Sequence, residues 1–306
     1  MTGFNTAAPV GTEGASAAAG RFCAFVSSSD RARDVFEIVF RNAETIWRDC
    51  NWPRYVGFTS KHPDIYGFKA LAAKRPSDWR EEFGDQLDSL PDHIEYLMLL
   101  LEDTLFMSPI NGSKLNEIAD LMVRADLAYV RLIPVRRNLL GLLIEYFKRQ
   151  LDKRPLRPLS FSEPYYSSVA ATIWKRSYLR SLLRQPGSIW DFEHIVTNER
   201  HFAVWEPALD QDQIVTKGKW SLRAPQRLAS QGVSLSNSKR EFRTFKSQIR
   251  DIREKIVFQA VGFLSFRVRR RLKRISHRAV PNSQSSSNAP SADYKIENSR
   301  AGNSQC

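Results

Sequence analysis

An uninterrupted apolar run that ends on two carboxylates constrains this chain more than any other feature. Residues 97–101 are LMLLL, and Glu102 and Asp103 follow directly. A strand that is apolar at every position suits a parallel sheet covered on both faces, because an edge strand alternates between core and water. We therefore expect a central strand here, within an α/β fold.

The position of Glu102 and Asp103 allows two interpretations. Ligands of open α/β sheets collect outside the carboxyl ends of the central strands, so carboxylates there would face a crevice and bind a metal or a substrate. Asp and Thr also commonly open turns, and Thr104 follows the pair. Taken alone, two adjacent acidic residues favour the turn.

The excess positive charge is concentrated near the carboxyl end. The 306 residues carry a formal net charge of +13, and residues 239–278 hold 14 basic and three acidic side chains. Only +2 is left for the rest of the chain. An excess placed in an appendage indicates an anionic partner surface rather than a basic active-site cleft.

The sequence favours a cytoplasmic protein. Residues 1–20 lack the basic start and apolar stretch of a secretory signal, and they are expected to form a disordered leader. No run approaches the roughly 18 apolar residues of a membrane-spanning helix. The three cysteines, Cys23, Cys50 and Cys306, have neither disulfide nor metal-site spacing, which fits a reducing compartment.

Predicted strands and helices alternate through the first half of the chain, as in β-α-β units. The expected strands cover residues 22–26, 55–59, 97–101, 127–134 and 165–174, and the expected helices cover 31–47, 79–90, 114–123, 138–154 and 175–184. We expect one main domain over residues 21–235. A basic helical extension over 236–278 and a disordered tail over 279–306 would follow it.

Ser29 and Asp30 follow the first predicted strand. Asp30 is most simply the N-cap of the next helix, with its carboxylate accepting from a free amide of the first turn. Alternatively, Ser29 or Asp30 contacts a nucleotide, as polar groups at the end of a first strand do in nucleotide-binding α/β folds. One residue can serve both purposes.

Three pieces of the sequence together resemble a known pattern. They are the strand ending in Glu102 and Asp103, the segment VAATIWKRSYL at residues 169–179, and the block Trp190-Asp191-Phe192-Glu193. In this order they resemble bacterial glycosyltransferase-like proteins of the GT-A, or nucleotide-diphospho-sugar transferase, fold over residues 21–220. The resemblance implies a GT-A-like, Rossmann-type, mostly parallel central sheet flanked by helices. It also implies sugar transfer from a nucleotide-sugar to a hydroxyl acceptor, in surface polysaccharide or glycolipid synthesis.

The resemblance implies a role for the first acidic motif. In the GT-A fold, the acidic motif after a central strand holds a divalent metal against the diphosphate of the donor. Mn2+ or Mg2+ is a hard cation that uses one or two carboxylates and fills its remaining positions with water and phosphate oxygens. Asp103 is the first expected ligand and Glu102 the second. Thr104 departs from the fuller Asp-x-Asp form.

The second acidic block supplies two candidates for the catalytic base, Asp191 and Glu193. The acceptor hydroxyl must lose its proton as the anomeric carbon gains oxocarbenium character, and a carboxylate beside aromatic walls can have a raised pKa. Alternatively, Asp191 caps the start of a buried helix.

Other polar and aromatic residues have weaker signals. Trp79 and Trp190 could stack on a nucleobase or sugar ring, although packing is the commoner role of tryptophan. Lys217 and Lys219 could reach phosphates, but an exposed turn is favoured. A lone His201 is more often structural than a metal ligand.

The basic extension has the composition of a helix that lies in a membrane interface. Residues 256–266 are largely apolar, and residues 267–274 are RVRRRLKR. We expect residues 256–274 to bind the anionic inner face of the membrane, near a saccharide or lipid-linked acceptor. A nucleic-acid-binding arm and a solvated helix are the alternatives. For the whole chain, the alternative function is a non-catalytic protein that binds nucleic acid or an anionic membrane.

Overall fold

The computed structural model of this protein describes residues 20–74, 77–134, 149–150, 154–161, 163, 165–185, 188–193, 195, 197, 199–235, 238–247 and 249. The chain divides into two compact units, Met1–Gln259 and Ala260–Cys306. The second unit, the leader, most of the predicted helix at 138–154 and the basic run at 256–274 fall outside the described residues.

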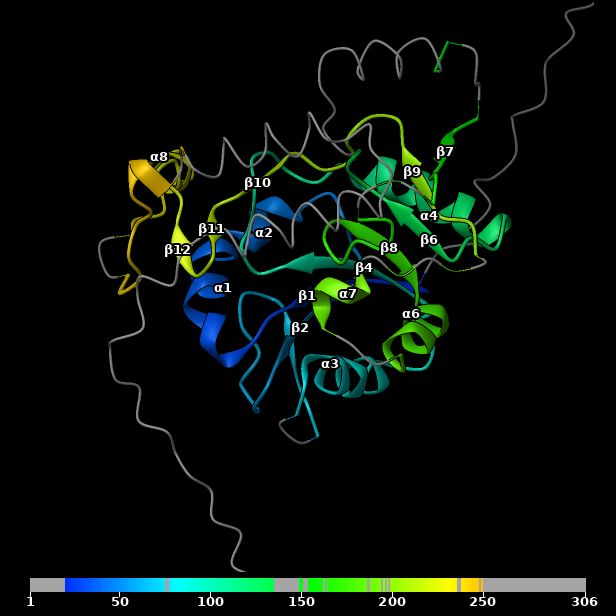
Figure 1. Ribbon diagram of the computed structural model, residues 1–306, viewed down its shortest axis with the longest axis horizontal. Coiled ribbons are helices and arrows are strands. Elements are labelled where there is room, and N and C mark those ends of the chain that lie inside the picture. The colour runs from blue at the N-terminus through cyan, green and yellow to red at the C-terminus, as the bar shows by residue number, and fades with distance from the viewer. Residues whose placement is uncertain are drawn as a thin grey trace, which may run out of the picture. The chain divides into compact units, whose positions relative to one another are not determined.

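An eight-stranded sheet with the order β3-β2-β1-β4-β8-β6-β9-β7 forms the centre of the first unit (Figure 1). Its strands are β1 (Phe22–Ser27), β2 (Arg54–Phe58), β3 (Lys69–Ala72), β4 (Tyr96–Leu101), β6 (Tyr129–Arg131), β7 (Leu156–Pro158), β8 (Thr172–Lys175) and β9 (Phe202–Val204). Within this sheet, β7 and β8 run against the other strands. The mostly parallel sheet predicted from the sequence is confirmed.

Strand β4 has the burial that its sequence predicts. Its first five residues are at most 1% exposed. Met98 and Leu100 belong to one hydrophobic core, and Leu97 and Leu99 belong to the other, because successive side chains point to opposite faces. Both faces of the sheet are covered, so β4 is apolar at every position.

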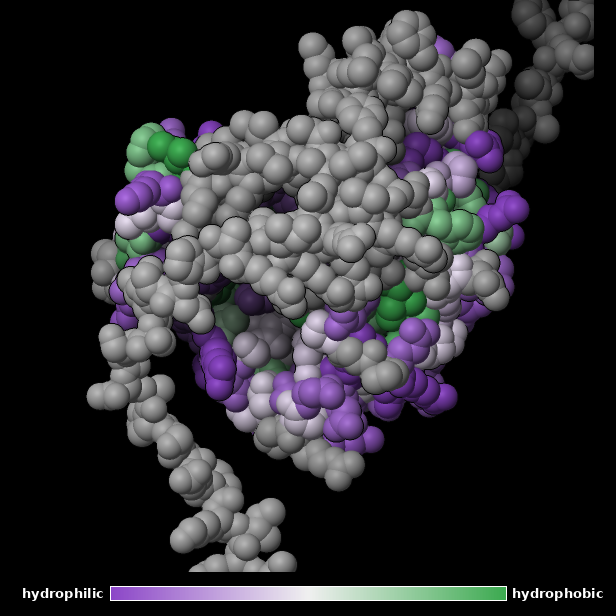
Figure 2. Space-filling model, in the orientation of Figure 1, coloured by the Kyte–Doolittle hydropathy of each residue, from purple (hydrophilic) through white to green (hydrophobic). Residues whose placement is uncertain are grey.

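Helices supply the cover on each face. The first core includes residues of α1 (Arg33–Val39), α2 (Ala43–Ile46), α4 (Gly112–Arg124) and α8 (Ala224–Ala229). The second core includes residues of α3 (Trp79–Asp88), α6 (Arg176–Leu183) and α7 (Ile189–Phe192). Figure 2 shows mostly hydrophilic residues over α3 in the lower part of the view, in agreement with the exposure of Glu81 and Asp88.

The helix predicted over residues 31–47 is interrupted. A 3-10 turn, η1 (Asp30–Ala32), leads into α1, and α1 ends before Phe40. The interruption lets two buried aromatic rings pack on one site, since the Phe40 and Trp47 ring centroids lie 5.3 and 5.5 Å from that of Phe68. Aromatic packing therefore outweighs the continuity of the helix.

The strand predicted over residues 165–174 is mostly wrong. Only Thr172–Lys175 pairs, and it pairs antiparallel to both β4 and β6. Tyr165 and Ala171 have φ angles of 55° and 51°, in a region that extended strands do not use. The apolar residues of this segment instead enter the second core through irregular backbone, as Tyr166 and Val169 do.

Two small antiparallel pairs lie outside the main sheet. Strand β5 (Thr104–Phe106) pairs with β10 (Gln211–Gln213), and β11 (Val215–Thr216) pairs with β12 (Lys219–Trp220). The first pair continues the chain directly from Glu102 and Asp103. Among the described helices, none has the length and hydropathy needed to span a bilayer.

Gly112 allows the start of α4 to approach the loop after α2. A Cβ atom on Gly112 would lie 1.6 Å from the Asp49 carbonyl oxygen, so Gly112→Ala would displace backbone. We expect this substitution to lower the free energy of unfolding by about 1–3 kcal/mol in urea denaturation. The matched control is Gly84→Ala in α3, where the new Cβ would meet the movable Arg180 guanidinium. Equal effects of the two substitutions would contradict this account.

Candidate active site

The order of the sheet reverses between β1 and β4. Strands β2 and β3 lie on one side of β1, and β4 lies on the other. In open α/β sheets such a switch point opens a crevice outside the carboxyl ends of the two strands. Ser27 pairs with Leu101, so the residues after β1 leave the sheet beside Glu102.

Glu102 and Asp103 form the turn between β4 and β5, which confirms the turn interpretation. Both residues are nevertheless only partly exposed. Gln213 Nε2 donates to Asp103 Oδ2 over 2.9 Å. Asp103 Oδ1 is buried, and it has no hydrogen-bond partner within the described part of the chain. The turn therefore leaves one buried carboxylate oxygen without a hydrogen bond from the described residues.

Burial makes both carboxyl groups of the turn hard to ionise. Burial, followed by the nearby Asp103 carboxylate, raises the pKa of Glu102 to about 7, while Arg240 acts in the opposite direction. Burial also raises the pKa of Asp103 above its ordinary value, against the hydrogen bond from Gln213. A cation bound here would favour the ionised form of both groups.

Two more buried polar atoms at this edge of the sheet lack hydrogen-bond partners among the residues described. They are Ser28 Oγ, directly after β1, and Arg131 Nη1, at the end of β6. Arg131 lies two strands from β4, or about 10 Å away at ordinary strand spacing. Buried polar groups are nearly always hydrogen-bonded, so atoms without partners at the switch point of a sheet favour a place for water, an ion or a ligand.

The interpretation of Asp30 as a helix cap is wrong. Asp30 lies inside η1, and α1 is preceded by Ala32, which has no side-chain cap. The Asp30 carboxylate instead accepts from Thr59 N (3.1 Å), Ser60 N (3.2 Å) and Ser60 Oγ (2.6 Å). The physical reason is tertiary, because parallel pairing of β1 and β2 brings the free amides after β2 to the end of β1.

These hydrogen bonds favour the ionised form of the Asp30 carboxyl group. Burial raises its pKa, but the hydrogen bonds from Ser60 and His62 outweigh burial and bring the pKa below its ordinary value. Ser29 occupies the position before η1, and its side chain makes no cap. Contact of Ser29 or Asp30 with a nucleotide stays a prediction.

The capping interpretation of Asp191 agrees with the structure. Ser188 is the N-cap of α7, and its Oγ accepts from Asp191 N over 3.3 Å. Asp191 Oδ2 in turn accepts from Ser188 N over 3.0 Å, which completes a capping box. Asp191 therefore stabilises the first turn of α7, whatever else it does.

Glu193 differs from Asp191 because it is buried, with 9% exposure. Burial raises its pKa, while a hydrogen bond from the Val169 backbone and the charge of Arg131 act against the rise. Since Arg131 ends β6, Glu193 belongs to the same sheet edge as Asp103. The two acidic motifs predicted from the sequence thus lie at one edge of the sheet.

Trp79, the first residue of α3, packs between α3 and α7. Its ring centroid lies 5.6 Å from that of Phe192 and 5.7 Å from that of Phe83. These contacts hold α7 on α3, as the packing interpretation expects. Stacking of Trp79 on a ligand ring stays a prediction, and the side chain of Trp190 lies outside the described part of the structure.

The remaining sequence candidates have structural roles. Lys217 and Gly218 form the turn of the β11–β12 hairpin, with φ angles of 52° and 74°, and Lys219 Nζ donates to Glu241 over 2.5 Å. His201 is buried, with Nδ1 3.0 Å from Tyr166 O and Nε2 2.9 Å from Tyr178 Oη. Burial lowers the pKa of His201 to about 4, so its ring is neutral.

Sequence analysis missed Ser28, Arg131 and Arg240. Arg131 had a detectable signal, because a charged residue at the end of a buried strand needs a partner. Arg240 had none. Its guanidinium bonds both carboxylate oxygens of Asp34 at 2.7 Å and acts on Glu102, although it lies far away in sequence.

The residues present fit a divalent cation held by few protein ligands. No group of three or more His, Cys, Asp or Glu side chains with metal-binding geometry occurs within the described ranges. Asp103 and Glu102 match instead the one or two carboxylates that Mg2+ ordinarily takes, with water and phosphate at its other positions. The unpaired Asp103 Oδ1 is the observation that favours this fit.

Two cavities of the structure lie away from these residues. One, of about 370 Å³, lies beside α4 and β9, and the other, of about 250 Å³, includes Asp126, Lys175 and Tyr178. Neither is lined by Asp103 or Glu193. The candidate site is therefore identified by its unpaired polar atoms and by sheet topology rather than by cavity size.

No family description and no curated protein sequence matches this chain. Solved structures with some similarity include a mannosyltransferase, PcManGT from Pyrobaculum calidifontis, in complex with GDP-Man and Mn2+, with a TM-score of 0.40 and 11% identity over 65% of this chain and 58% of that one. A structure of residues 1–349 of TarS from S. aureus has a TM-score of 0.39 and 9% identity, over 62% of this chain and 59% of that one. A second TarS structure has the same TM-score and identity, over 79% of this chain and 44% of that one.

The chain spans less than two thirds of the length of these structures. Because these TM-scores are low, the fold class is based on the strand order and strand directions of this chain's own sheet. A mostly parallel sheet of eight strands, reversed between β1 and β4 and covered by helices on both faces, is the GT-A-like arrangement that the sequence resemblance implies.

The raised pKa of Glu102 predicts a loss of stability as pH rises. Below its ordinary pKa of 4.5, Glu102 is protonated in both the folded and unfolded chains. Between 4.5 and about 7 the folded chain holds the proton more tightly, so folding stability falls with increasing pH, by up to about 3 kcal/mol from this residue. Glu102→Gln should remove this part of the dependence in urea denaturation at pH 4.5 and 8.

Glu95→Gln is the matched control for this prediction. A hydrogen bond from Arg21 holds the pKa of Glu95 below its ordinary value, so its titration in the folded chain falls below this pH window. The wild-type protein and the Glu95→Gln variant should therefore lose similar stability between pH 4.5 and 8. An unchanged pH dependence in Glu102→Gln would show that Glu102 titrates normally.

Proposed function

We propose that this protein is a glycosyltransferase that moves a sugar from a nucleotide-sugar to a hydroxyl acceptor. The observation that carries the proposal concerns two buried polar atoms, Ser28 Oγ and Asp103 Oδ1, at the switch point of a mostly parallel sheet. Neither has a hydrogen-bond partner among the residues that the structure describes. A hydroxyl group can donate to a phosphate oxygen, and a carboxylate oxygen can bind a cation. A diphosphate with its cation would satisfy both atoms.

Asp103 would hold Mn2+ or Mg2+ together with Glu102. A bound divalent cation supplies neutralisation of the negative charge that develops on the departing diphosphate. Ser28 would donate its hydroxyl hydrogen to a phosphate oxygen, and Gln213 would keep the Asp103 carboxylate oriented through its 2.9 Å bond. Ser29 and Asp30 follow β1 closely, and they are proposed to contact the nucleoside.

Glu193 is a better candidate than Asp191 for the base that receives the acceptor proton. The Asp191 carboxylate is already used in the capping box with Ser188. Glu193 is buried, and a raised pKa makes a carboxylate a stronger base near neutral pH. Arg131 beside it opposes the rise and so keeps Glu193 available in its ionised form.

The acceptor is proposed to be a saccharide or a lipid-linked saccharide. Residues 256–274 would hold the protein on the anionic inner face of the membrane, close to such an acceptor. Support for this part comes from composition alone, since these residues lie outside the described ranges.

Binding of the donor should raise the melting temperature. With a nucleoside diphosphate and Mn2+ at about 100 times Kd, linkage gives about 2.7 kcal/mol of stabilisation, or a shift of several degrees. We expect Asp103→Asn to abolish the part of this shift that depends on Mn2+. A panel of UDP, GDP and their sugars would identify the nucleotide.

Asp212→Asn is the matched control for Asp103→Asn. Asp212 lies on β10 beside Gln213, but its carboxylate lies 3.6 Å from Arg227. A metal-dependent shift that survives in Asp103→Asn would refute the assignment of this residue. Binding to anionic vesicles that is lost when Arg269, Arg270 and Arg271 are replaced, with no nucleotide shift, would favour the non-catalytic alternative.

The two candidates for the base can be separated by turnover. Glu193→Gln should lower kcat by about 100-fold or more, because a general base contributes about 10²- to 10⁴-fold to the rate. The rise in melting temperature with nucleotide should persist in this variant. Asp191→Asn should weaken the start of α7 but leave kcat within about tenfold of the wild-type value. The measurement is sugar transfer with the donor found above, and the opposite ranking would assign the base to Asp191.

A further inference from the structure

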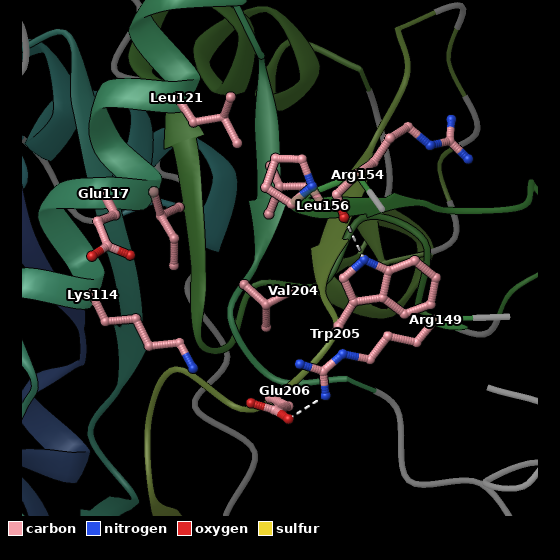
Figure 3. Close-up of a pocket in the computed structure, with 11 residues that line it drawn as sticks. Lys114, Glu117, Leu121, Arg149, Arg154, Leu156, Val204, Trp205 and Glu206 are labelled. Carbon is pink, nitrogen blue, oxygen red and sulfur yellow. Dashed lines mark hydrogen bonds and ion pairs between the residues drawn. The ribbon is translucent and has the colours of Figure 1, made fainter. Parts of the chain in front are cut away.

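A cavity of about 370 Å³ lies between α4 and the strands β7 and β9, apart from the switch point (Figure 3). Its apolar walls include Ile118 and Leu121 from α4, opposite Leu156 and Val204 from the strands. A cavity of this volume is large enough for a small ligand.

Charged groups of both signs surround these apolar walls. Lys114 and Glu117 lie on α4, and Arg149 and Glu206 form an ion pair at the opposite side, as Figure 3 shows. A sugar hydroxyl can donate to a carboxylate and accept from an ammonium or guanidinium group. The lining carries three basic residues, with Arg154 as the third, and two carboxylates, so it presents no charge of a single sign to a strongly anionic or cationic ligand. An oily ligand would strip water from these charges. The lining therefore matches a polyhydroxylated ligand.

Trp205 gives the cavity an aromatic surface with a fixed orientation. Its Nε1 donates to the Arg154 carbonyl oxygen over 2.9 Å, which satisfies the polar atom of the ring. What remains is the apolar ring, a surface on which the C–H face of a sugar can lie. An aromatic ring beside hydrogen-bonding groups of both signs is a combination suited to a saccharide.

The cavity lies at the same sheet edge as the candidate active site. Strand β9 runs parallel to β6, so Trp205 and Glu206 follow the carboxyl end of β9. The chain then continues to β10, where Gln213 donates to Asp103. The eight residue-to-residue steps from Trp205 to Gln213 span at most about 28 Å when fully extended. One segment thus leads from the cavity to the proposed metal ligand.

We propose that this cavity binds sugar units of the acceptor that are remote from the reacting hydroxyl. The claim that the cavity is part of an acceptor site rests on the proposed function. The claim that the cavity binds a saccharide does not depend on it. Such a site would favour long saccharide chains over short ones. The enzyme would then hold its acceptor at two places along the edge of the sheet.

The test uses the full-length chain on an array of neutral and acidic glycans. We expect the wild type to bind a set of oligosaccharides, and Trp205→Ala to lower this affinity at least about tenfold. Leu121→Arg, on the opposite wall, should have the same effect. Trp205→Phe keeps an aromatic ring without the hydrogen bond to Arg154, and it should retain most of the binding.

The rise in melting temperature caused by the nucleoside diphosphate with Mn2+, measured for each variant, separates this proposal from the proposed function. An intact shift in Trp205→Ala shows that the variant is folded, so that a loss of glycan binding reports on the cavity. Glycan binding that depends on Trp205 without any nucleotide shift would leave the saccharide site standing and overturn the donor site. The saccharide site would be overturned if the wild type bound no glycan, or if Trp205→Ala and Leu121→Arg both bound glycans as tightly as the wild type does.

Discussion

Parallel pairing of β1 with β4 is the constraint on which the rest of the structure depends. The two strands pair in register from Phe22 with Tyr96 to Ser27 with Leu101. Both are buried on their two faces, so their backbone groups must be satisfied by neighbouring strands. Because both strands stop at the same level, the polar segments after them leave the sheet side by side. This alone brings Ser28 next to Glu102.

Burial and charge oppose each other at this point. The core on both faces extends to the turn between β4 and β5, so Glu102 and Asp103 lose water that free carboxylates would keep. Asp30 shows the other outcome, since three hydrogen-bond donors after β2 compensate its burial. The acidic turn is compensated less, because Gln213 bonds one Asp103 oxygen while Asp103 Oδ1 has no partner among the described residues. Such a polar group in an otherwise well-packed protein favours a binding site.

Several elements of the fold could be predicted because their signals are local. The uniform apolar run of β4 required cover on both faces, and the Ser188–Asp191 spacing is that of a capping box. The strand predicted over residues 165–174 failed in its first seven residues, because positive φ angles at Tyr165 and Ala171 cannot be recognised from apolar composition. The role of Asp30 also failed, because its partners belong to another strand.

The sequence by itself determined that a buried central strand would end on carboxylates and that a second acidic block would follow a basic helix. Hydrophobic periodicity is a property of short segments, so it can be recognised without knowledge of the fold. Only the tertiary structure decided which polar atoms lack partners, and that Gln213, Arg131 and Arg240 surround the acidic residues. The physical reason is that hydrogen bonding and desolvation depend on neighbours distant in sequence, which the sheet order brings together.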